Sequence, residues 1–314
     1  MEQRPKQKHA HYMSRQGGQK SSIEKGVTPM KEVRRSDFAG SWYPGNESDC
    51  RTSIDEFSDA SLPCPKDGDA VGGIVPHAGW FYSGKIACNV IKCLSQHTQP
   101  DTCIIFGRHL HPGSGNFIME RGRWATPLGD LEIDSELATK LTAEFPFTVE
   151  TSSHYEPDNT IELQLPFIKY FFPKTRIVPI GAPPRLTSLE IAGKAVEIAK
   201  NLGRKTIIVG STDLTHYGYN YGYVPKGAGE EAVEWVKNKN DKQVVDLMLE
   251  MDGQGVIQES LENHNACCSG AAGAAIEATK KLGAKRAEKI LYYTSYDIRP
   301  DTSFVGYVGI VFSM

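Results

Sequence analysis

His77, His109 and His216 each stand in a loop a few residues after a short apolar run. Gly or Pro lies close to each of them, which lets the backbone turn sharply and approach a ligand. A single loop histidine is usually a hydrogen-bonding group, but three at equivalent positions favour a shared pocket. Because imidazole binds metal ions and transfers protons near neutral pH, this pattern predicts a metal or acid–base site.

Two cysteines, Cys267 and Cys268, stand directly before a run of small residues, Ala271–Ile276, that is predicted to be helical. A thiol at a helix N-terminus ionises easily, because the helix dipole and the free amides there stabilise the thiolate. The thiolate is the form that coordinates metal or attacks an electrophile. Taken alone, the segment fits equally well with two small residues that pack beneath a tight turn.

The elements that must position these residues alternate along the chain. Buried strands are predicted at 71–75, 102–106, 176–180 and 205–209, with further strands at 290–293 and 304–312 at the edge or centre of the sheet. Helices are predicted at 48–59, 84–95, 135–144, 160–171, 187–202, 228–250 and 270–282. Strands separated by helices form βαβ units, so the sequence predicts an α/β fold with a mostly parallel central sheet flanked by helices.

Such a sheet explains how residues far apart in the chain could meet. Ligands of open α/β sheets bind outside the carboxyl ends of the strands. His77, His109 and His216 follow three of the predicted strands, and Asp213 stands in the same loop as His216. We therefore expect these side chains to share one pocket. His111, two positions after His109, fits the same topological position.

Basic residues are concentrated at the N-terminus. The formal net charge is −3, yet residues 1–35 hold nine Lys or Arg against three acids, which leaves 26 bases against 35 acids, or −9, for the remainder. Residues 1–35 show no apolar period and are predicted to be a disordered basic tail, followed by a single domain at 36–314. The acidic body is a poor nucleic-acid binder, so no nucleic-acid partner is expected.

The location of the protein is predicted from what its sequence lacks. No run approaches the roughly 20 uninterrupted apolar residues of a membrane helix, and the N-terminus has no apolar core of a secretory signal. We therefore expect a cytoplasmic protein with no membrane partner. Seven cysteines, an odd number without a CxxC ladder, argue against a disulfide framework, and most are expected to be small buried residues.

Five ordered blocks of sequence resemble the signature blocks of the MEMO family. They are Ala39–Pro44, Val75–Gly84, Trp124–Gly129, Ile161–Phe167 and Ser211–Gly218. The resemblance runs from about Phe38 to the C-terminus. It implies a fold similar to that of the catalytic subunits of class III extradiol dioxygenases, the non-haem iron enzymes that cleave catechol rings.

The resemblance also implies a metal site. MEMO proteins are described as binding iron or copper through two histidines and a cysteine, which correspond here to His77, His109 and Cys268. Cys267 is an extra neighbour of Cys268 and remains an alternative. The spacing from Thr126 selects His109, with His111 as the alternative.

The pocket around this metal follows from the same resemblance. Asp213 and His216 are implied as pocket residues, with His216 as general acid or base and Asp213 as its orienting partner. Many family members have a histidine at the position of Asn159. Trp80 and Tyr82 are candidates for the pocket wall or for packing, and Glu162 for a buried carboxylate near the site or a helix-start charge.

Three classes of function fit these residues. The first is a metal-dependent, dioxygenase-like redox enzyme in which a thiolate replaces the usual carboxylate ligand of iron. The second is a module that binds a ligand or a phosphotyrosine peptide without catalysis, as eukaryotic relatives are described to do. The third is a hydrolase in which zinc on the same residues activates water. A reactive thiol beside two histidines argues against the second, because a surface that only binds peptides would not need it.

The resemblance also implies partners. Prokaryotic members, known as protein B of the AmmeMemoRadiSam system, are often encoded near a radical-SAM protein and an AMMECR-type protein. We expect both as partners, beside a small-molecule or peptide substrate whose identity the sequence does not show.

Overall fold

The structure is a computed structural model, and it describes residues 32–66 and 68–314. The described residues belong to one compact unit. Its helices are α1 (Glu47–Phe57), α2 (Trp80–His97), α3 (Ser135–Glu144), α4 (Asn159–Glu162), α5 (Leu165–Phe171), α6 (Leu186–Asn201), α7 (Glu230–Trp235), α8 (Asp241–Leu249), α9 (Gly253–Asn263), α10 (Ser269–Leu282) and α11 (Ser295–Ile298). Its strands are β1 (Val33–Arg34), β2 (Ala70–Val75), β3 (Thr102–Gly107), β4 (Asn116–Met119), β5 (Arg123–Trp124), β6 (Leu131–Glu132), β7 (Phe147–Glu150), β8 (Arg176–Gly181), β9 (Thr206–Ser211), β10 (His216–Tyr217), β11 (Arg286–Thr294) and β12 (Phe304–Ser313).

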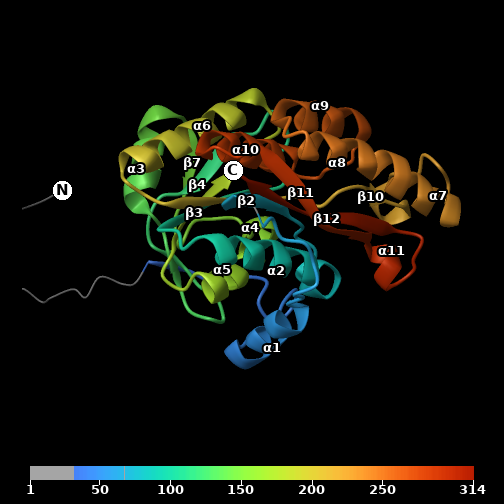
Figure 1. Cartoon of the computed structure of the whole chain (residues 1–314), viewed down its shortest axis with the longest axis horizontal. Coiled ribbons are helices and arrows are strands. Elements are labelled where there is room, and N and C mark those ends of the chain that lie inside the picture. The colour runs from blue at the N-terminus through green and yellow to red at the C-terminus, as the bar shows by residue number, and fades with distance from the viewer. Residues whose placement is uncertain (1–31, 67) are drawn as a thin grey trace, which may run out of the picture. The chain divides into compact units, whose positions relative to one another are not determined.

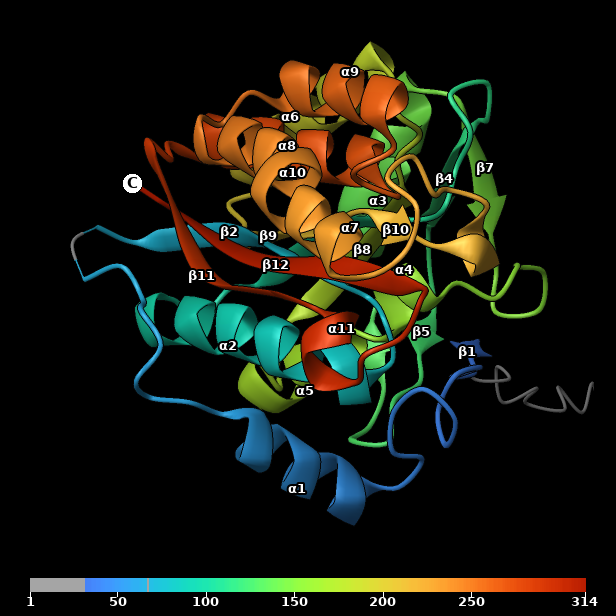
Figure 2. The ribbon, with the colours of Figure 1, turned by 90° about the vertical axis from the view of Figure 1, so that its right-hand side faces the viewer.

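A nine-stranded sheet lies between two layers of helices (Figures 1 and 2). The strand order is β10-β12-β2-β9-β3-β8-β4-β7, and β11 pairs with β12. Strands β2, β9, β3 and β8 form the parallel centre, whereas β12 and β4 pair antiparallel with the two ends of that centre. Helices α2 and α5 cover one face, and α6, α8, α9 and α10 cover the other. The predicted α/β class with a parallel central sheet flanked by helices is confirmed.

Glycines in the central strands let α10 lie close to the sheet. A Cβ added at Gly210 of β9 would come 2.5 Å from the Cβ of Ala275, and one at Gly72 of β2 would come 2.5 Å from Cγ2 of Thr279. Neither surface has room for a further side chain, so the small residues of the helix and the glycines of the strands depend on each other. This packing fixes the N-terminus of α10 beside the ends of the central strands.

The predicted boundary of the N-terminal tail is wrong. The prediction extends the tail to residue 35, whereas Val33–Arg34 form β1, which pairs with β5. Arg34 is buried because its guanidinium stacks 3.6 Å from the ring centre of Trp124 and pairs with Glu150 at 3.0 Å. One basic residue in a polar segment gives no sign of such a site. Residues 1–31 of the predicted tail lie outside the described residues.

Several elements differ from the predicted ones. The helix predicted at 160–171 is two helices, α4 and α5, and the one at 228–250 is broken by a π-helical segment, Val236–Asn240. Helix α9 and the strands β4 to β7 were not predicted. These strands have two to four residues each, too few to show an alternating pattern. A 3₁₀ turn, Tyr219–Tyr221, follows β10.

One disulfide joins Cys64 to Cys93. This finding corrects the expectation drawn from the odd cysteine count, because the pair is 29 positions apart and meets only when the loop after α1 folds onto α2. The five other cysteines are free, and Cys50, Cys88 and Cys103 are fully buried as expected.

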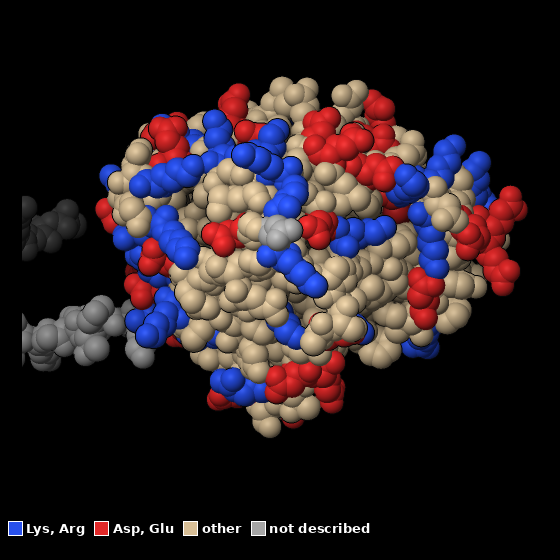
Figure 3. Space-filling model, viewed as in Figure 1, with Lys and Arg blue, Asp and Glu red and all other residues tan. Residues whose placement is uncertain are grey.

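The surface carries charges of both signs. On the face shown in Figure 3, Lys and Arg are interspersed with Asp and Glu. Within residues 32–66 and 68–314, no helix is long and apolar enough to cross a membrane.

Candidate functional site

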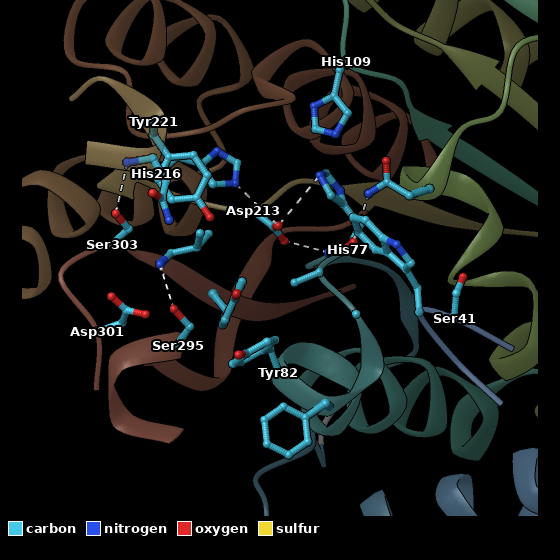
Figure 4. A pocket seen from close by; sticks show the side chains of 18 residues that line it. Ser41, His77, Tyr82, His109, Asp213, His216, Tyr221, Ser295, Asp301 and Ser303 are labelled. Atoms are coloured by element: carbon cyan, nitrogen blue, oxygen red, sulfur yellow. Dashed lines mark hydrogen bonds and ion pairs between the residues drawn. The ribbon is translucent and has the colours of Figure 1, made fainter. Parts of the chain in front are cut away.

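Four potential metal donors gather at the carboxyl ends of the central strands. We call them the strand-end group: His77, His109, Cys267 and Cys268. One ligand atom from each lies within 4.8 Å of the others. The two imidazoles meet edge to face with ring centres 4.9 Å apart, at one end of a cavity (Figure 4). The structure thus brings together the three ligands that the sequence predicts, with Cys267 beside them.

His77 is held so that one ring nitrogen stays available. Its side chain is 1% exposed, and its Nδ1 lies 3.0 Å from Oγ of Ser211. The Ser211 hydroxyl donates to the carbonyl oxygen of Thr160 at 2.7 Å, so its oxygen accepts the proton of His77 Nδ1. Nε2 of His77 is then the nitrogen that faces Sγ of Cys267 at 3.2 Å. Metal-binding histidines are commonly fixed in this way by a hydrogen bond at the other nitrogen.

His109 is positioned by an unusual turn at Arg108. Arg108 has φ +78°, in the left-handed region that residues with side chains rarely adopt. Its buried guanidinium pairs with Glu150 at 2.6 Å, and its amide donates to Oγ1 of Thr160 at 2.7 Å. These contacts hold the strained turn in place. His109 Nδ1 consequently lies 3.4 Å from Sγ of Cys268.

Short hydrogen bonds tie the two cysteines to the loop after β9. The amide of Cys267 donates to the carbonyl oxygen of Asp213 at 3.1 Å, and the amide of Asp213 donates to Sγ of Cys267 at 3.3 Å. The amide of Cys268 donates to Oγ1 of Thr212 at 3.1 Å. The loop after β9 leads directly into His216, the first residue of β10. The same loop therefore holds both the two thiols and one of the imidazoles.

The protonation of the strand-end group favours cation binding. The pKa of Cys267 lies well below its usual value. Burial disfavours the Cys267 thiolate, but the hydrogen bond from the Cys268 thiol and the charge of His77 stabilise it more strongly. Burial and the neighbouring Cys267 raise the pKa of Cys268. Although burial disfavours the charged imidazole, Asp213 and Cys267 outweigh it and raise the pKa of His77 to about 9. Without metal, one thiolate therefore faces a protonated imidazole, and a metal ion would displace protons from the group.

Asp213 lies between two histidines (Figure 4). Its Oδ1 accepts the backbone amide of His77 at 2.7 Å, and its Oδ2 lies 3.9 Å from Nε2 of both His77 and His216. Burial raises the pKa of Asp213, although the positive charge of His77 opposes this rise. The His216 side chain is 30% exposed and packs against Tyr221, with ring centres 4.9 Å apart. Asp213 can therefore orient His216, which can exchange a proton at the cavity surface.

Asp241, outside the cavity, holds the loop of Asp213 and His216. Its Oδ1 accepts the backbone amide of Thr215 at 3.0 Å as well as the Thr215 hydroxyl. Its Oδ2 accepts the hydroxyl of Tyr292 at 2.8 Å. Burial raises the pKa of Asp241 to about 6, against these hydrogen bonds. Asp241 thus positions a neighbouring segment without facing the cavity.

The cavity beside the histidines has a volume of about 640 Å³ and an aromatic wall. Among its lining residues are five aromatic ones, Trp42, Phe81, Tyr82, Tyr221 and Tyr307. Phe81 is 70% exposed, although a large apolar ring is usually covered. Of the described residues that line the cavity, none is Lys or Arg and two are Asp. The cavity therefore offers flat apolar surface and negative charge.

Comparison with known proteins identifies the family. The family model described as Memo-like protein matches residues 34–311. The chain belongs to the MEMO family. A MEMO1 family protein of Pyrococcus abyssi is 35% identical over 89% of this chain and 99% of its own length. The MEMO1 family protein of Methanopyrus kandleri is 34% identical over 87% of this chain and 96% of its own.

A solved structure adds little to this assignment. An uncharacterized protein of Escherichia coli K12 gives a TM-score of 0.43 at 11% identity, over 77% of this chain and 99% of that one. A likeness this weak carries no argument. The resemblance to the MEMO family seen in the five sequence blocks is confirmed by the family match and the archaeal relatives.

The structure separates His109, which the spacing from Thr126 selects, from the alternative, His111. His109 is in the strand-end group, whereas Nδ1 of His111 accepts the amide of Gly113 at 3.1 Å. His111 lines a second cavity of about 600 Å³, which is also lined by Cys267 and shares His216 with the first cavity. Asn159, where many MEMO members have a histidine, lines the first cavity, and its amide donates to the carbonyl oxygen of His77 at 3.1 Å.

The aromatic residues of the second block divide between two roles. Trp80 is 3% exposed and stacks on Phe167 with ring centres 4.1 Å apart, and its Nε1 donates to the carbonyl oxygen of Leu163 at 3.1 Å. Trp80 is therefore a packing residue. Tyr82, two positions later, lines the cavity (Figure 4).

Glu162 is a buried carboxylate that binds the N-terminal segment rather than the metal donors. It accepts the amides of Asp37 at 2.9 Å and Phe38 at 2.7 Å and the hydroxyl of Tyr43 at 3.0 Å. Burial raises the pKa of Glu162, although these hydrogen bonds oppose the rise. By fixing both ends of this segment, Glu162 brings Trp42 to the cavity.

Sequence reasoning missed Ser211, Asp241 and the orientation of Cys267. Ser211 opens the fifth sequence block, two positions after a predicted strand, so a hydroxyl at the carboxyl end of that strand was a usable signal. No sequence signal pointed to Asp241, because it lies in a helix whose pattern is set by apolar residues.

Proposed function

We propose that this MEMO protein holds iron or copper with His77, His109 and Cys268 and carries out redox chemistry on an organic substrate. One observation carries the proposal: Ser211 uses Nδ1 of His77, and Nε2 therefore faces the thiols. Imidazole and thiolate are donors that suit both metals. When bound, iron or copper would supply the one-electron steps that side chains do not.

Sulfur makes the donor set soft. Extradiol dioxygenases hold iron with two histidines and a carboxylate, whereas thiolates favour copper(I) or tune iron differently. Cys267 lies next to His77, and Cys268 lies next to His109, so either thiol can complete a set of three donors. A set that used both thiols would resemble a closed zinc site and leave no position for substrate. The proposal therefore needs one of the two thiols to stay off the ion.

Asp213 and His216 supply the proton chemistry in this proposal. His216 faces the cavity, and Asp213 lies at ion-pair distance from it. His216 takes a proton from a bound substrate and returns it to the product, while Asp213 keeps the imidazole oriented. Tyr221, which packs against His216 with its ring tilted by 35°, limits the positions that the imidazole can adopt.

The cavity wall favours a neutral or cationic aromatic substrate. Exposed Phe81 and Trp42 offer flat surfaces for stacking, and the rings attract cations as well. A phosphorylated peptide is normally bound by Arg or Lys, which none of the described lining residues provides. A diphenol or an aromatic amine therefore fits this cavity better than a phosphopeptide does.

The metal is tested by elemental analysis of untagged protein purified without oxygen. The variants are His77→Ala, Cys267→Ser and Cys268→Ser, with His111→Ala as the matched control because His111 lies nearby but outside the strand-end group. We expect His77→Ala to lose iron or copper and His111→Ala to retain it. Cys268→Ser should lose the metal if Cys268 is the ligand. If Cys267 is the ligand instead, Cys267→Ser should lose it.

Two outcomes would overturn the proposal. One is full retention of metal by His77→Ala and by the double variant Cys267→Ser/Cys268→Ser. The other is a combined result: the anaerobically purified protein contains zinc, and after loading with iron or copper it takes up no oxygen with any diphenol or aromatic amine. That result would favour hydrolysis instead.

The substrate class is tested by calorimetry with a diphenol, an aromatic amine and phosphotyrosine. We expect the first two to bind and Phe81→Ala to weaken them, while Leu186→Ala, an exposed apolar residue elsewhere, leaves binding unchanged. Tighter binding of phosphotyrosine would favour a phosphopeptide-binding module. A cytoplasmic location, expected from the sequence, and work with a radical-SAM protein and an AMMECR-type protein, implied by the resemblance, remain part of this proposal.

A further inference from the structure

A second group of metal-type donors lies at the other end of α2. We call it the helix-end group: Cys64, Cys93 and His97. Their ligand atoms lie within 4.8 Å of one another. Helix α2 starts just after His77 and has 18 residues, so roughly 27 Å of helix separates this group from the strand-end group. None of its residues lines the cavity beside His77.

The helix-end group combines a local pair with a distant residue. Cys93 and His97 are four positions apart on the last turn of α2, so their side chains lie on the same face of the helix. Cys64 comes from the loop between α1 and β2 and forms the disulfide with Cys93. Nε2 of His97 lies 3.5 Å from Sγ of Cys64. A disulfide needs no imidazole beside it, whereas a metal site needs a third donor.

We propose that the Cys64–Cys93 disulfide closes a latent metal site, which opens on reduction and binds zinc or a similar thiol-seeking divalent ion. A dithiol reductant supplies two electrons and two protons and is itself oxidised to a disulfide. The S–S bond breaks, and two thiols form. The divalent ion then displaces both thiol protons and binds two thiolates and the neutral imidazole of His97.

The charges around the group fit a cation. The group stands at the C-terminal end of a long helix, where the unpaired carbonyl groups favour positive charge. Two thiolates balance the charge of a divalent ion, so the nearby Lys66 and Lys92 then face a site of no net charge. In the oxidised protein the sulfur atoms are neutral, and nothing in the group attracts an ion strongly.

The surroundings leave a fourth coordination position for water. A cavity of about 430 Å³ adjoins the three donors. Asp59 also lines it, but its carboxylate pairs with Lys85 at 3.0 Å and accepts the hydroxyl of Ser61 at 2.6 Å. Asp59 is therefore already engaged. Two cysteines, one histidine and a water molecule match the four-coordinate geometry of zinc.

The redox half of the proposal is tested by counting thiols in the unfolded chain. Without reductant we expect five free thiols, and after treatment with a dithiol we expect all seven. Free Cys64 and Cys93 in protein that has never been reduced would overturn the disulfide as the closed form.

The metal half is tested on the full chain by alkylation and peptide mass spectrometry. After reduction and removal of the dithiol, zinc should slow alkylation of Cys64 and Cys93 together, and His97→Ala should weaken that protection at least roughly tenfold. The matched control is His154→Ala, an exposed histidine outside both groups. Equal alkylation with and without zinc, or full protection in the His97→Ala variant, would overturn the proposal.

The two metal proposals fail separately in this experiment. The readout is specific to the peptides that carry Cys64 and Cys93, so it does not depend on what Cys267 and Cys268 bind. Circular dichroism of each reduced variant shows whether it is folded. If His97→Ala does not fold, Cys64→Ser provides the second test, because it should leave Cys93 unprotected by zinc.

Discussion

The strand-end group and the helix-end group offer similar donors but are built in opposite ways. The first draws its ligands from three loops that the parallel sheet brings together, and each ligand is fixed by a neighbour such as Ser211 or Arg108. The second takes two ligands from one helical turn and a third that is covalently attached. A site of the first kind depends on the whole sheet, whereas the second depends on one helix and one loop.

Removal of Arg108 should disturb the strand-end group most strongly. Arg108→Met leaves Asp158 buried without a cation and Glu150 with Arg34 alone, so we expect a loss of about 3–5 kcal/mol in the free energy of unfolding. The turn that places His109 should relax, and metal binding by the strand-end group should weaken. Urea unfolding measures the first effect. Arg121→Met, which breaks an exposed pair with Glu32, should change little, and a similar loss there would contradict the argument.

Removal of Cys64 should affect the helix-end group alone. In metal-free buffer without reductant, Cys64→Ser should lower the free energy of unfolding by about 2–4 kcal/mol, because the unfolded chain loses a cross-link. With a dithiol present, the variant and the parent protein should unfold alike. His154→Ala, an exposed change that removes no disulfide, is the control. A loss that persists in the dithiol would mean that Cys64 acts by packing.

Removal of the Ser211 hydroxyl should loosen the strand-end metal without touching its ligands. Ser211→Ala frees Nδ1 of His77, so both the tautomer and the ring orientation become variable, and metal affinity should fall about 10- to 100-fold. Competition with a chelator measures this fall. Ser303→Ala removes a hydroxyl that lines the cavity and accepts the amide of Asn220, and it should leave the affinity unchanged. Equal affinities for Ser211→Ala and the parent would contradict the tautomer argument.

The pH dependence of metal binding should reveal the proton on His77. In the metal-free protein the pKa of His77 is raised to about 9, so metal must displace a proton at neutral pH. Metal affinity should therefore rise steeply as the pH increases towards that value and less steeply above it, where the Cys268 thiol still has a proton to lose. Proton release on adding metal, measured in a weak buffer, should decline over the same range. An unchanged slope through this range would show that His77 is neutral before metal binds.

The same raised pKa gives the metal-free fold its own pH dependence. Protonated His77 stabilises the fold fully below its unfolded value of about 6.5, and this contribution is lost as the pH rises towards the folded value. Thermal unfolding of the metal-free protein should therefore occur at lower temperature as the medium becomes more alkaline, and His77→Ala should remove that trend.

The sequence was informative where function depends on local order. His77, His109 and His216 follow strands, and the rule that ligands bind at strand ends was enough to expect them in one place. The residues that orient them were harder to find. The left-handed turn at Arg108 depends on ion pairs with distant carboxylates, so the spacing from Thr126 could select His109 but could not show what holds it in place.

Contacts between distant segments explain most of the remaining differences. The pairing of Cys64 with Cys93 depends on how a loop folds over α2, which a cysteine count does not encode. Arg34 is buried only because Trp124 and Glu150 receive it. The choice between Cys267 and Cys268 is similar, since the turn before α10 points one thiol at each imidazole.

The anchoring of residues 37–43 by Glu162 has a consequence for the cavity wall. That segment belongs to no long helix or strand, yet it contributes Trp42 to the cavity wall, and Tyr221 comes from another short connection. This part of the wall is thus built separately from the strands that position the strand-end group. Substitutions in these connections would reshape the wall and leave the spacing of the four donors as it is.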